Sequence, residues 1–455
     1  MSAFVTKIRT DISEKIIYQI MFRTFTPEGD IRSATARLRH IAELGVDIIY
    51  LSPFCLMDDD TDRSAWSARQ IASGMENPKN PYRIGDYFKI DAEYGDEDDL
   101  AEFMRVAHGL GLLVFFDLVY MHCGPSQFPK EHSAFLKRDD EGKILCSKYN
   151  FPLLDYENPE LREYMWSNML YWVEKFDVDG YRCDVGDRVP LSFWREGRRR
   201  IEEKKPRFYM INEGQAPSYM EEVFDLSYYN HSFSWNDVIY KSFKSGKAGI
   251  HHSFRMIYEA LKARFPDGAM LLRAYENHDF TVDYGEERLD RTHPHIIEAL
   301  LVMNFTIDGA PMLYSGNEFG DSGRHTMWRW SGDRYCVDWS VSESESGQRR
   351  IDFVKKLCDI RHRFASLSYG ETNMIKDTDF LVFTRTLGDE KIKATFRFEA
   401  SEAVCPAPTG RILLCKNASE SGESGESGES GESGEGYILG EGGYILELIN
   451  KGEEI

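Results

Sequence analysis

Short apolar runs alternate with longer amphipathic segments through about the first 370 residues of the chain. Runs that are rich in Ile, Val, Phe and Tyr and are bounded by polar residues are typical of buried strands. The segments between them carry apolar residues at helical spacing, as in Ala34–Leu44 and Asp98–Leu110. A third such segment, Pro159–Phe176, begins with proline directly after Asn158, which is a favoured helix start. The predicted strands are Ile16–Phe25, Asp47–Phe54, Leu112–Tyr120, Gly180–Val185, Phe208–Glu213, Val223–Tyr228, Met270–Glu276 and Ala310–Tyr314.

Eight strand–helix units over roughly 350 residues predict an α/β fold, a (β/α)8 TIM barrel with insertions. A doubly wound open sheet is the alternative, but the glycine-rich phosphate loop of such sheets is missing after the first strand. One insertion, 120–158, separates the third strand from its helix, and another, Leu56–Asn80, follows the second strand. The latter contains an acidic cluster without the alternating spacing of a calcium loop, so we expect a solvated loop there. The cluster consists of Asp58, Asp59, Asp60 and Asp62.

The pattern changes after about Gly370, where strand-like runs follow one another without helical segments. We therefore predict a C-terminal antiparallel β domain, sandwich-like, over residues 371–455, beside a barrel built from residues 1–119 and 159–370. Residues 419–436 form a tandem Ser-Gly-Glu repeat without one apolar side chain. Because such a segment cannot bury surface to offset its ordering entropy, we expect a mobile loop.

The charge balance is acidic, since 76 Asp and Glu against 55 Lys and Arg give a net charge of −21. This disfavours nucleic acid and anionic membranes as partners, because both attract basic surfaces. The first residues lack the apolar stretch of a signal peptide, and no apolar run approaches the ~18 residues that span a bilayer. The eight cysteines are scattered without a Cys-x-x-Cys pair, which fits neither a zinc site nor a disulfide framework. We expect reduced thiols in a cytoplasmic protein, and we leave its oligomeric state open.

Acidic residues stand at the ends of four predicted strands, although desolvating a charge there is costly. In a (β/α)8 barrel the functional groups gather at the C-terminal strand ends. Four acids that face one bowl repel one another, so at least one of them should have a raised pKa. Such a site could cleave a glycoside, with one carboxylate as nucleophile and a protonated second one as proton donor. The four acids are Asp117, Asp184, Glu213 and Asp279.

Acidic clusters also bind magnesium or manganese, so a metal-dependent lyase or isomerase is the rival interpretation. The flanking residues favour the glycosidase. Arg182 lies two residues before Asp184, so both side chains share one face of the strand and the guanidinium should keep the carboxylate ionised. His122 and His278 can hydrogen-bond sugar hydroxyls.

Several motifs, taken in their order along the chain, resemble those of the α-amylase family of retaining glycoside hydrolases. Asp117-Leu-Val-Tyr-Met-His122 resembles the first conserved region of that family, and Gly180-Tyr-Arg-Cys-Asp184 resembles the second. Glu213 follows an apolar strand as the acid/base of the third region does, and Asn277-His278-Asp279 resembles the fourth region. The stretch from Asn80 to Gly95 resembles the one that supplies a tyrosine stacking on the sugar.

The resemblance implies a barrel with a short domain B at 120–158 and a fairly open cleft. It also implies roles for individual residues: Asp184 as nucleophile, Glu213 as acid/base and Asp279 as stabiliser of the transition state. The implied substrate-binding residues are Tyr82, Asp117, His122, Arg182 and His278.

The implied function is hydrolysis of α-glucosidic bonds in malto-oligosaccharides or related α-glucans by double displacement. A transglycosylase or sugar isomerase acting on trehalose- or sucrose-type substrates would use the same scaffold. A third possibility is a non-catalytic scaffold protein, like the amino-acid-transporter subunits that share this barrel. Those subunits have lost the catalytic acids, whereas this chain keeps all three.

One departure from the family pattern concerns calcium. Met121 stands where the family usually has an asparagine that ligates structural calcium. After Asp184 the chain reads Val-Gly-Asp-Arg, in place of the Lys-His of many calcium-dependent amylases. A thioether is a poor calcium ligand. We therefore expect no metal and no cofactor, with the usual calcium site absent.

Overall fold

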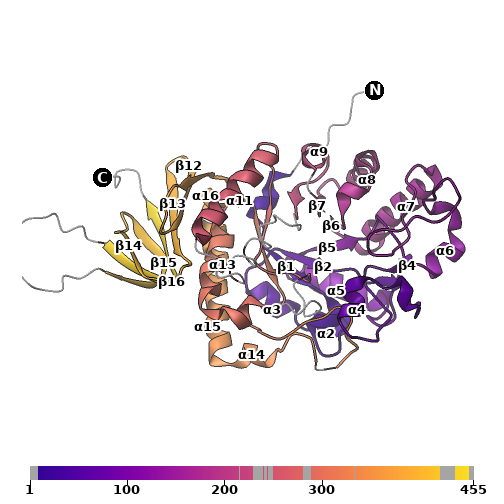
Figure 1. Ribbon diagram of the computed structural model, residues 1–455, viewed down its shortest axis with the longest axis horizontal. Coiled ribbons are helices and arrows are strands. Elements are labelled where there is room, and N and C mark those ends of the chain that lie inside the picture. Colours follow the sequence, from indigo (N-terminus) through magenta and orange to yellow (C-terminus); the bar gives the residue numbers. More distant parts are fainter. Residues whose placement is uncertain are drawn as a thin grey trace, which may run out of the picture.

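The computed structural model describes residues 9–214, 216–228, 239, 243, 249–279, 288–332, 334–420 and 436–449. It has a large α/β part and a smaller all-β part, and Figure 1 shows the β part at one end of the long axis. Among the helices in these residues, none combines the length and the hydropathy that a membrane span requires.

The α/β part is built on a ring of parallel strands. They are β1 (Ile17–Ile20), β2 (Ile48–Leu51), β5 (Leu113–Leu118), β6 (Gly180–Cys183), β7 (Tyr209–Asn212), β8 (Leu226–Ser227), β9 (Leu272–Arg273) and β10 (Ala310–Tyr314). Their order is β8-β7-β6-β5-β2-β1-β10-β9. A parallel bridge between Ser227 on β8 and Leu271 beside β9 joins the two ends of this order. The predicted barrel is confirmed, and each of the eight predicted segments contains one of its strands.

Helices cover the outside of the ring (Figure 1). The predicted helix Pro159–Phe176 is confirmed as α7 with the same bounds, and the side chain of Asn158 accepts hydrogen bonds from its first free amides. The other helices along the barrel are α1 (Phe22–Phe25), α5 (Glu97–Gly109), α8 (Leu191–Lys204), α9 (Pro217–Glu222), α11 (Ile250–Arg264), α12 (Leu289–Thr292), α13 (Ile297–Thr306), α14 (Ser340–Glu343), α15 (Glu345–Arg363) and α16 (Ala365–Tyr369). Short 3-10 turns are η1 (Thr10–Glu14), η2 (Arg63–Ala65), η3 (Ser133–Phe135), η4 (Gly186–Arg188) and η6 (Pro294–Ile296).

The segment predicted as one helix over residues 34–44 is split between two helices. They are α2 (Ile31–Thr35) and α3 (Leu38–Glu43). The backbone amide of Arg37 bonds to the carbonyl of Ala34, three residues back, so the chain tightens there and the α-helical ladder stops. Apolar spacing alone did not predict this break.

Two insertions extend the loops at the C-terminal ends of β2 and β5. The first contains α4 (Ala68–Ala72) and a two-stranded antiparallel sheet of β3 (Cys55–Met57) and β4 (Ile84–Ile90). The second, residues 120–158, contains α6 (Gln127–Glu131) and several isolated bridges.

The acidic cluster of the first insertion is not uniformly solvated, contrary to our expectation. Asp58 is fully buried and forms an ion pair with the buried Arg83. One of its oxygens accepts hydrogen bonds from the backbone amides of Ser126 and Gln127 at 2.7 and 2.9 Å. The prediction was wrong for this residue because its partners come from the second insertion, far along the chain. Asp58 thus connects the two insertions.

The C-terminal part is a six-stranded antiparallel sheet, which confirms the predicted β domain. β16 pairs with β13, β14 and β15, and β12 lies between β11 and β13. The sandwich-like layout and the domain bounds stay predictions, and residues 421–435 of the Ser-Gly-Glu repeat lie outside the described residues. The strands are β11 (Glu371–Ile375), β12 (Leu381–Leu387), β13 (Glu390–Arg397), β14 (Ala403–Pro406), β15 (Arg411–Glu420) and β16 (Gly436–Ile449).

Inward-facing apolar side chains fill the barrel below the strand ends. Phe115 of β5 belongs to this cluster, together with Ile17, Ile48, Tyr209 and Leu272. The neighbouring position on β6 is Gly180, and a Cβ there would lie 2.7 Å from the Phe115 ring. Side chains two residues apart on a strand face the same way. Asp117 and Arg182 therefore continue these two rows directly above the apolar layer.

Candidate active site

The four predicted acids all lie at the C-terminal ends of barrel strands. Asp117 is on β5, Asp184 and Glu213 directly follow β6 and β7, and Asp279 follows β9. Asp117, Asp184 and Glu213 are buried, with exposed fractions of 6, 6 and 8%. The predicted gathering of acids at one end of the barrel is present.

The guanidinium of Arg182 binds three of these carboxyl groups. Its Nη1 donates to both oxygens of Asp117 at 2.8 and 2.9 Å and to Oδ1 of Asp184 at 3.0 Å. Its Nη2 lies 2.7 Å from Oε2 of Glu213. The register places Arg182 beside Asp117, because these two residues pair across β5 and β6. The expected contact with Asp184 is confirmed, and the other two contacts go beyond the sequence prediction.

One guanidinium facing three carboxyl groups leaves an excess of negative charge. Burial raises the pKa of Glu213 to about 8; Arg182 opposes this shift, and the charges of Asp184 and Asp279 reinforce it. Burial also raises the pKa of Asp184, to about 6, against the effects of Arg182 and of a hydrogen bond from Glu213. At pH 7 the site therefore holds a protonated Glu213 beside an ionised Asp184. A proton donor next to an ionised nucleophile is the arrangement that acid-assisted displacement requires.

The backbone at Val185 contributes to holding Glu213. Val185 has a φ of 43°, in the left-handed region that β-branched residues rarely adopt. This conformation directs its backbone amide to Oε2 of Glu213, at 3.0 Å. Glu213 is thus held by one amide and one guanidinium, at the expense of local backbone strain.

Asp279 is held by an arginine that the sequence analysis did not consider. Arg69 of α4 donates from Nη1 to Oδ1 of Asp279 at 2.8 Å and from Nη2 to its backbone oxygen at 2.7 Å. Burial alone would raise the pKa of Asp279, but His278, Arg69 and Arg182 together lower it below its usual value. Asp279 is therefore ionised at pH 7. The guanidinium of Arg69 also lies over the ring of Trp328, 5.5 Å from its centre.

Tyr82 and His278 form a pair beside the acids. The Tyr82 hydroxyl lies 2.6 Å from Nε2 of His278 and donates to Oδ2 of Asp117 at 3.4 Å. The two rings are nearly parallel, with an interplanar angle of 15°. Asp117 also accepts a hydrogen bond from the hydroxyl of Tyr50 at 2.7 Å. These contacts bring Tyr82, His278 and Asp117 into the same site as Arg182, as the sequence predicts.

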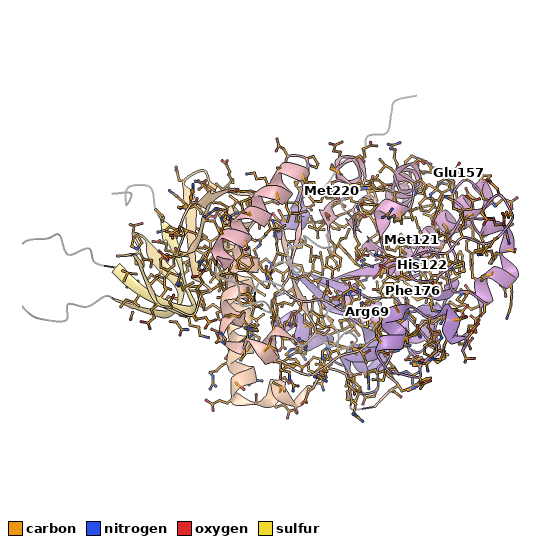
Figure 2. The ribbon with its side chains drawn as sticks, viewed as in Figure 1. Arg69, Met121, His122, Glu157, Phe176 and Met220 are labelled. Atoms are coloured by element: carbon orange, nitrogen blue, oxygen red, sulfur yellow. The ribbon has the colours of Figure 1, made fainter. Side chains whose placement is uncertain are left out.

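His122 lies one layer further from the carboxylates. Its Nε2 is 3.1 Å from the backbone oxygen of Tyr82, and its ring packs on Phe151 at 4.9 Å between centres. Burial lowers the pKa of His122 to about 4, so the ring is neutral at pH 7. Figure 2 shows His122 in the barrel half of the molecule, together with Met121 and Arg69. Its contacts support Tyr82, and direct binding of a sugar hydroxyl by His122 stays a prediction.

No three His, Cys, Asp or Glu side chains of the described segments are grouped so that they could hold a metal ion. Met121, at the position of the usual calcium ligand, packs partly buried against the main apolar core. All eight cysteines lie within the described residues and are free thiols. The absence of calcium from the working protein stays a prediction.

Among the residues that contact the predicted site, sequence reasoning missed Gln19, Tyr50 and Arg69. Gln19 and Tyr50 each interrupt an apolar strand with a polar group that faces the barrel interior. A buried polar group on a strand needs a partner, so these positions did carry a detectable signal. Arg69 carried none, because its contact with Asp279 depends on how the first insertion folds over the barrel.

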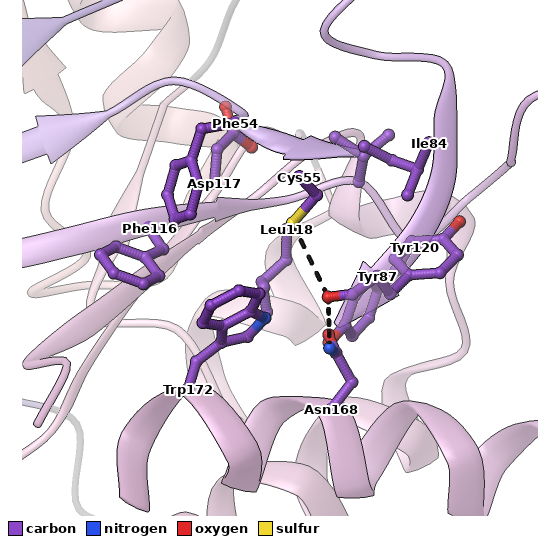
Figure 3. Close-up of a pocket in the computed structure, with 11 residues that line it drawn as sticks. Phe54, Cys55, Ile84, Tyr87, Phe116, Asp117, Leu118, Tyr120, Asn168 and Trp172 are labelled. Atoms are coloured by element: carbon purple, nitrogen blue, oxygen red, sulfur yellow. Dashed lines mark hydrogen bonds between the residues drawn. The ribbon is translucent and has the colours of Figure 1, made fainter. Parts of the chain in front are cut away.

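A small cavity lies behind Asp117, between β5 and α7 (Figure 3). Its volume is about 10 Å³, and its lining includes Phe54, Phe116 and Trp172. Asn168 donates to the backbone oxygen of Tyr87 at 2.7 Å along its edge. A space of this size holds at most about one water, so it belongs to the packing behind the site.

A (β/α)8 barrel with buried carboxyl groups of different pKa at its strand ends is an arrangement that glycoside hydrolases use. Comparison with known sequences gives the particular family. The alpha-amylase catalytic domain model matches residues 9–144 and 140–352. The chain therefore belongs to the alpha-amylase family.

Individual relatives agree with this assignment. Alpha-amylase MalA of Haloarcula japonica is 28% identical over 381 residues, which cover 78% of this chain and 50% of that protein. An intracellular maltogenic amylase of Bacillus subtilis is 26% identical over 393 residues, covering 81% of this chain and 61% of the relative. The chain thus spans half to about three-fifths of the length of these curated relatives. The crystal structure of an alpha-amylase from Lactobacillus plantarum shares the fold, with a TM-score of 0.74 at 23% identity over 97% of this chain and all of that one.

Proposed function

We propose that the chain is a retaining α-glycosidase that hydrolyses α-glucosidic bonds in malto-oligosaccharides or related α-glucans. The observation that carries this proposal is the buried pair of Asp184 and Glu213 around the guanidinium of Arg182, where burial raises the pKa of Glu213 further than that of Asp184. An ionised nucleophile and a protonated acid in one site are the two groups that double displacement needs.

In the first step an oxygen of Asp184 attacks the anomeric carbon, and the bond from this carbon to the leaving oxygen breaks. Glu213 gives its proton to that oxygen, so the departing sugar leaves as an alcohol. A glycosyl ester of Asp184 remains, with its anomeric configuration inverted. In the second step Glu213, now ionised, takes a proton from water while the water oxygen displaces Asp184. Two inversions give net retention.

The remaining site residues bind and stabilise. The ionised Asp279 lies where it would offset the positive charge that develops on the sugar ring, and it would also bind ring hydroxyls. Arg182 keeps Asp184 from accepting a proton at neutral pH. Tyr82 supplies an aromatic surface for the sugar, and His278, Asp117 and His122 supply polar contacts.

The relatives support the substrate class and the location. One is named an alpha-amylase and another an intracellular maltogenic amylase. We therefore include in the proposal an α-linked oligosaccharide as substrate and the cytoplasm as the site of action. The proposed reaction uses only carboxyl groups and water, so the proposal includes no cofactor. It includes no calcium either, because Met121 stands at the position of the usual calcium ligand and a thioether is a poor ligand for calcium.

The test is hydrolysis of maltotriose followed by proton NMR in the first minutes, before mutarotation mixes the anomers. We expect the new reducing end to appear first as the α-anomer. A first product in the β-anomer would contradict the retaining mechanism. No hydrolysis of any substrate in a panel of α-1,4-, α-1,6- and α,α-1,1-linked glucosides would contradict the glycosidase itself. The Asp184→Asn variant, purified in parallel, controls for a contaminating host amylase.

A further inference from the structure

Gln19 is a fully buried amide on β1, between two apolar neighbours. A buried amide costs free energy unless its donors and acceptors are bonded. Its Oε1 accepts a hydrogen bond from the backbone amide of His278 at 3.4 Å. Its Nε2 lies 2.6 Å from Nδ1 of the His278 ring and donates to Oγ of Ser52 at 3.3 Å. Two of the three contacts of the Gln19 amide are therefore with one residue of the active site.

The chemistry of the backbone decides which way these hydrogen bonds run. A backbone amide can only donate, so the Gln19 atom that faces it must be the oxygen. The amide nitrogen of Gln19 then faces Nδ1 of His278. Because this nitrogen can also only donate, Nδ1 accepts and carries no proton.

The charge state of the ring decides where the remaining proton lies. His278 is 1% exposed, and burial lowers its pKa to about 4; Asp279 opposes this shift, and Arg182 and Arg69 reinforce it. The ring is therefore neutral at pH 7. A neutral imidazole without a proton on Nδ1 carries it on Nε2. Nε2 lies 2.6 Å from the hydroxyl of Tyr82 and 3.8 Å from Oδ2 of Asp279.

We propose that Gln19 is a positioning residue that holds His278 in its Nε2–H tautomer and thereby directs the Tyr82 hydroxyl toward Asp117. With its oxygen accepting from Nε2–H, the Tyr82 hydroxyl has its own proton free for Oδ2 of Asp117, 3.4 Å away. The hydrogen bonds run in one direction from Gln19 through His278 and Tyr82 to Asp117. His278 thus directs its one ring N–H to the Tyr82 hydroxyl before any substrate arrives, so the polarity of this pair need not reorganise on binding.

Two substitutions of Gln19 test the tautomer in different ways. Burial raises the pKa of a carboxyl, so the spectrum of Gln19→Glu is followed upward from pH 7; once ionised, the carboxylate can only accept, and Nδ1 of His278 must gain a proton. In Gln19→Met a side chain of similar length makes neither of the two hydrogen bonds to His278, so the tautomer of the His278 ring is no longer held. Ser315→Ala is the matched control, because Ser315 donates to the backbone oxygen of Gln19 at 2.6 Å and leaves the amide untouched.

The direct measurement is the nitrogen chemical shifts of the His278 ring in the full chain, labelled with ¹⁵N-histidine. The chain has 12 histidines, so the spectrum of His278→Gln identifies the two resonances of interest. At pH 7 we expect a bare Nδ1 and a protonated Nε2 in the unsubstituted protein and in Ser315→Ala. We expect a protonated Nδ1 in Gln19→Glu. A protonated Nδ1 in the unsubstituted protein at pH 7, or a tautomer that stays unchanged in Gln19→Glu as the pH is raised, would overturn the proposal.

The kinetic consequence rests on the proposed function, whereas the NMR result does not. With a malto-oligosaccharide that the protein cleaves, we expect Gln19→Glu to lower kcat on the order of 10–100-fold, the size of effect seen when a residue that orients a metal-ligating histidine is replaced. We expect the change in KM of Gln19→Glu to be smaller than the change in kcat. The activity of Ser315→Ala should stay within a few-fold of that of the unsubstituted protein. An equal loss of kcat in both variants would overturn the positioning role. If the unsubstituted protein cleaves nothing, the proposed glycosidase fails and the chemical shifts still decide the tautomer.

Discussion

Two buried clusters of charge in this molecule are built in opposite ways. In the first, between the two insertions, Asp58 faces Arg83 and accepts further hydrogen bonds from the backbone amides of Asp60, Ser126 and Gln127. In this cluster one carboxylate faces one guanidinium, and three backbone amides donate further hydrogen bonds to the carboxylate. In the second, at the strand ends, Arg182 faces three carboxyl groups.

The difference separates a structural ion pair from a chemical site. A carboxylate that faces one guanidinium and has both oxygens hydrogen-bonded joins two segments of the chain. An excess of carboxyl groups has to be relieved by holding a proton, here on Glu213. The same excess that costs stability would supply the acid for the proposed catalysis, so substitutions in the two clusters should have opposite effects on stability.

The largest expected effect is on turnover at the strand ends. Asp184→Asn removes the proposed nucleophile, and we expect kcat to fall on the order of 10⁴-fold or more, as for other covalent catalysts. Circular dichroism and thermal unfolding should show a folded protein of at least equal stability. Activity within tenfold of the unsubstituted protein would refute the role of Asp184.

The next effect is on stability, at the insertions. Asp58→Asn removes the charge opposite Arg83 and turns an amide NH2 toward donors, because both oxygens of Asp58 accept hydrogen bonds. We expect a loss of about 3 kcal/mol in the free energy of unfolding, measured with urea. Turnover by the folded fraction of this variant should stay within a few-fold of that of the unsubstituted protein. The neighbouring Asp59→Asn, at an exposed position, should change stability by less than about 0.5 kcal/mol. Equal losses in both variants would argue against the structural role of Asp58.

Glu213→Gln should stabilise the protein while abolishing acid catalysis. The folded state keeps its proton on Glu213 between the ordinary pKa of 4.5 and about 8, whereas the unfolded state releases it. Stability therefore falls as the pH rises through this window. An uncharged glutamine removes this loss of stability. We therefore expect the free energy of unfolding of the variant to be about 1–3 kcal/mol higher than that of the unsubstituted protein at pH 8, and nearly equal to it at pH 4.5. Urea unfolding at both pH values measures the difference. If Glu213→Gln were less stable than the unsubstituted protein at pH 8, the inference of excess negative charge around Arg182 would be wrong.

The smallest effect concerns the pH dependence of kcat/KM. Asp184 must be ionised and Glu213 protonated, so activity should fall below about pH 6 and above about pH 8. Each limb should lose about tenfold per pH unit. In Glu213→Gln, assayed with an aryl α-glycoside whose leaving group needs no proton, the alkaline limb should disappear. An alkaline limb that persists in this variant would assign the limb to another group.

The barrel and the placement of the acids could be predicted because both depend on short-range patterns. Ile17–Ile20 and Gly180–Cys183 are mostly apolar segments of strand length, and Asn158 before Pro159 is a favoured helix start. The two-residue spacing of Arg182 and Asp184 places both on one face of a strand without knowledge of the neighbouring strands. These features follow from backbone geometry, which repeats every two residues in a strand and every 3.6 in a helix.

Contacts between distant segments could not be predicted in the same way. Arg69 reaches Asp279 across 210 residues of chain, and Gln19 reaches His278 across 259. Asp58 was predicted to be solvated because its donors in the second insertion are invisible to a local pattern. Residue types alone identified the groups that can do chemistry here. Only the folded barrel set their charges, since a pKa depends on burial and on neighbours whose distances the strand register and the loop packing decide.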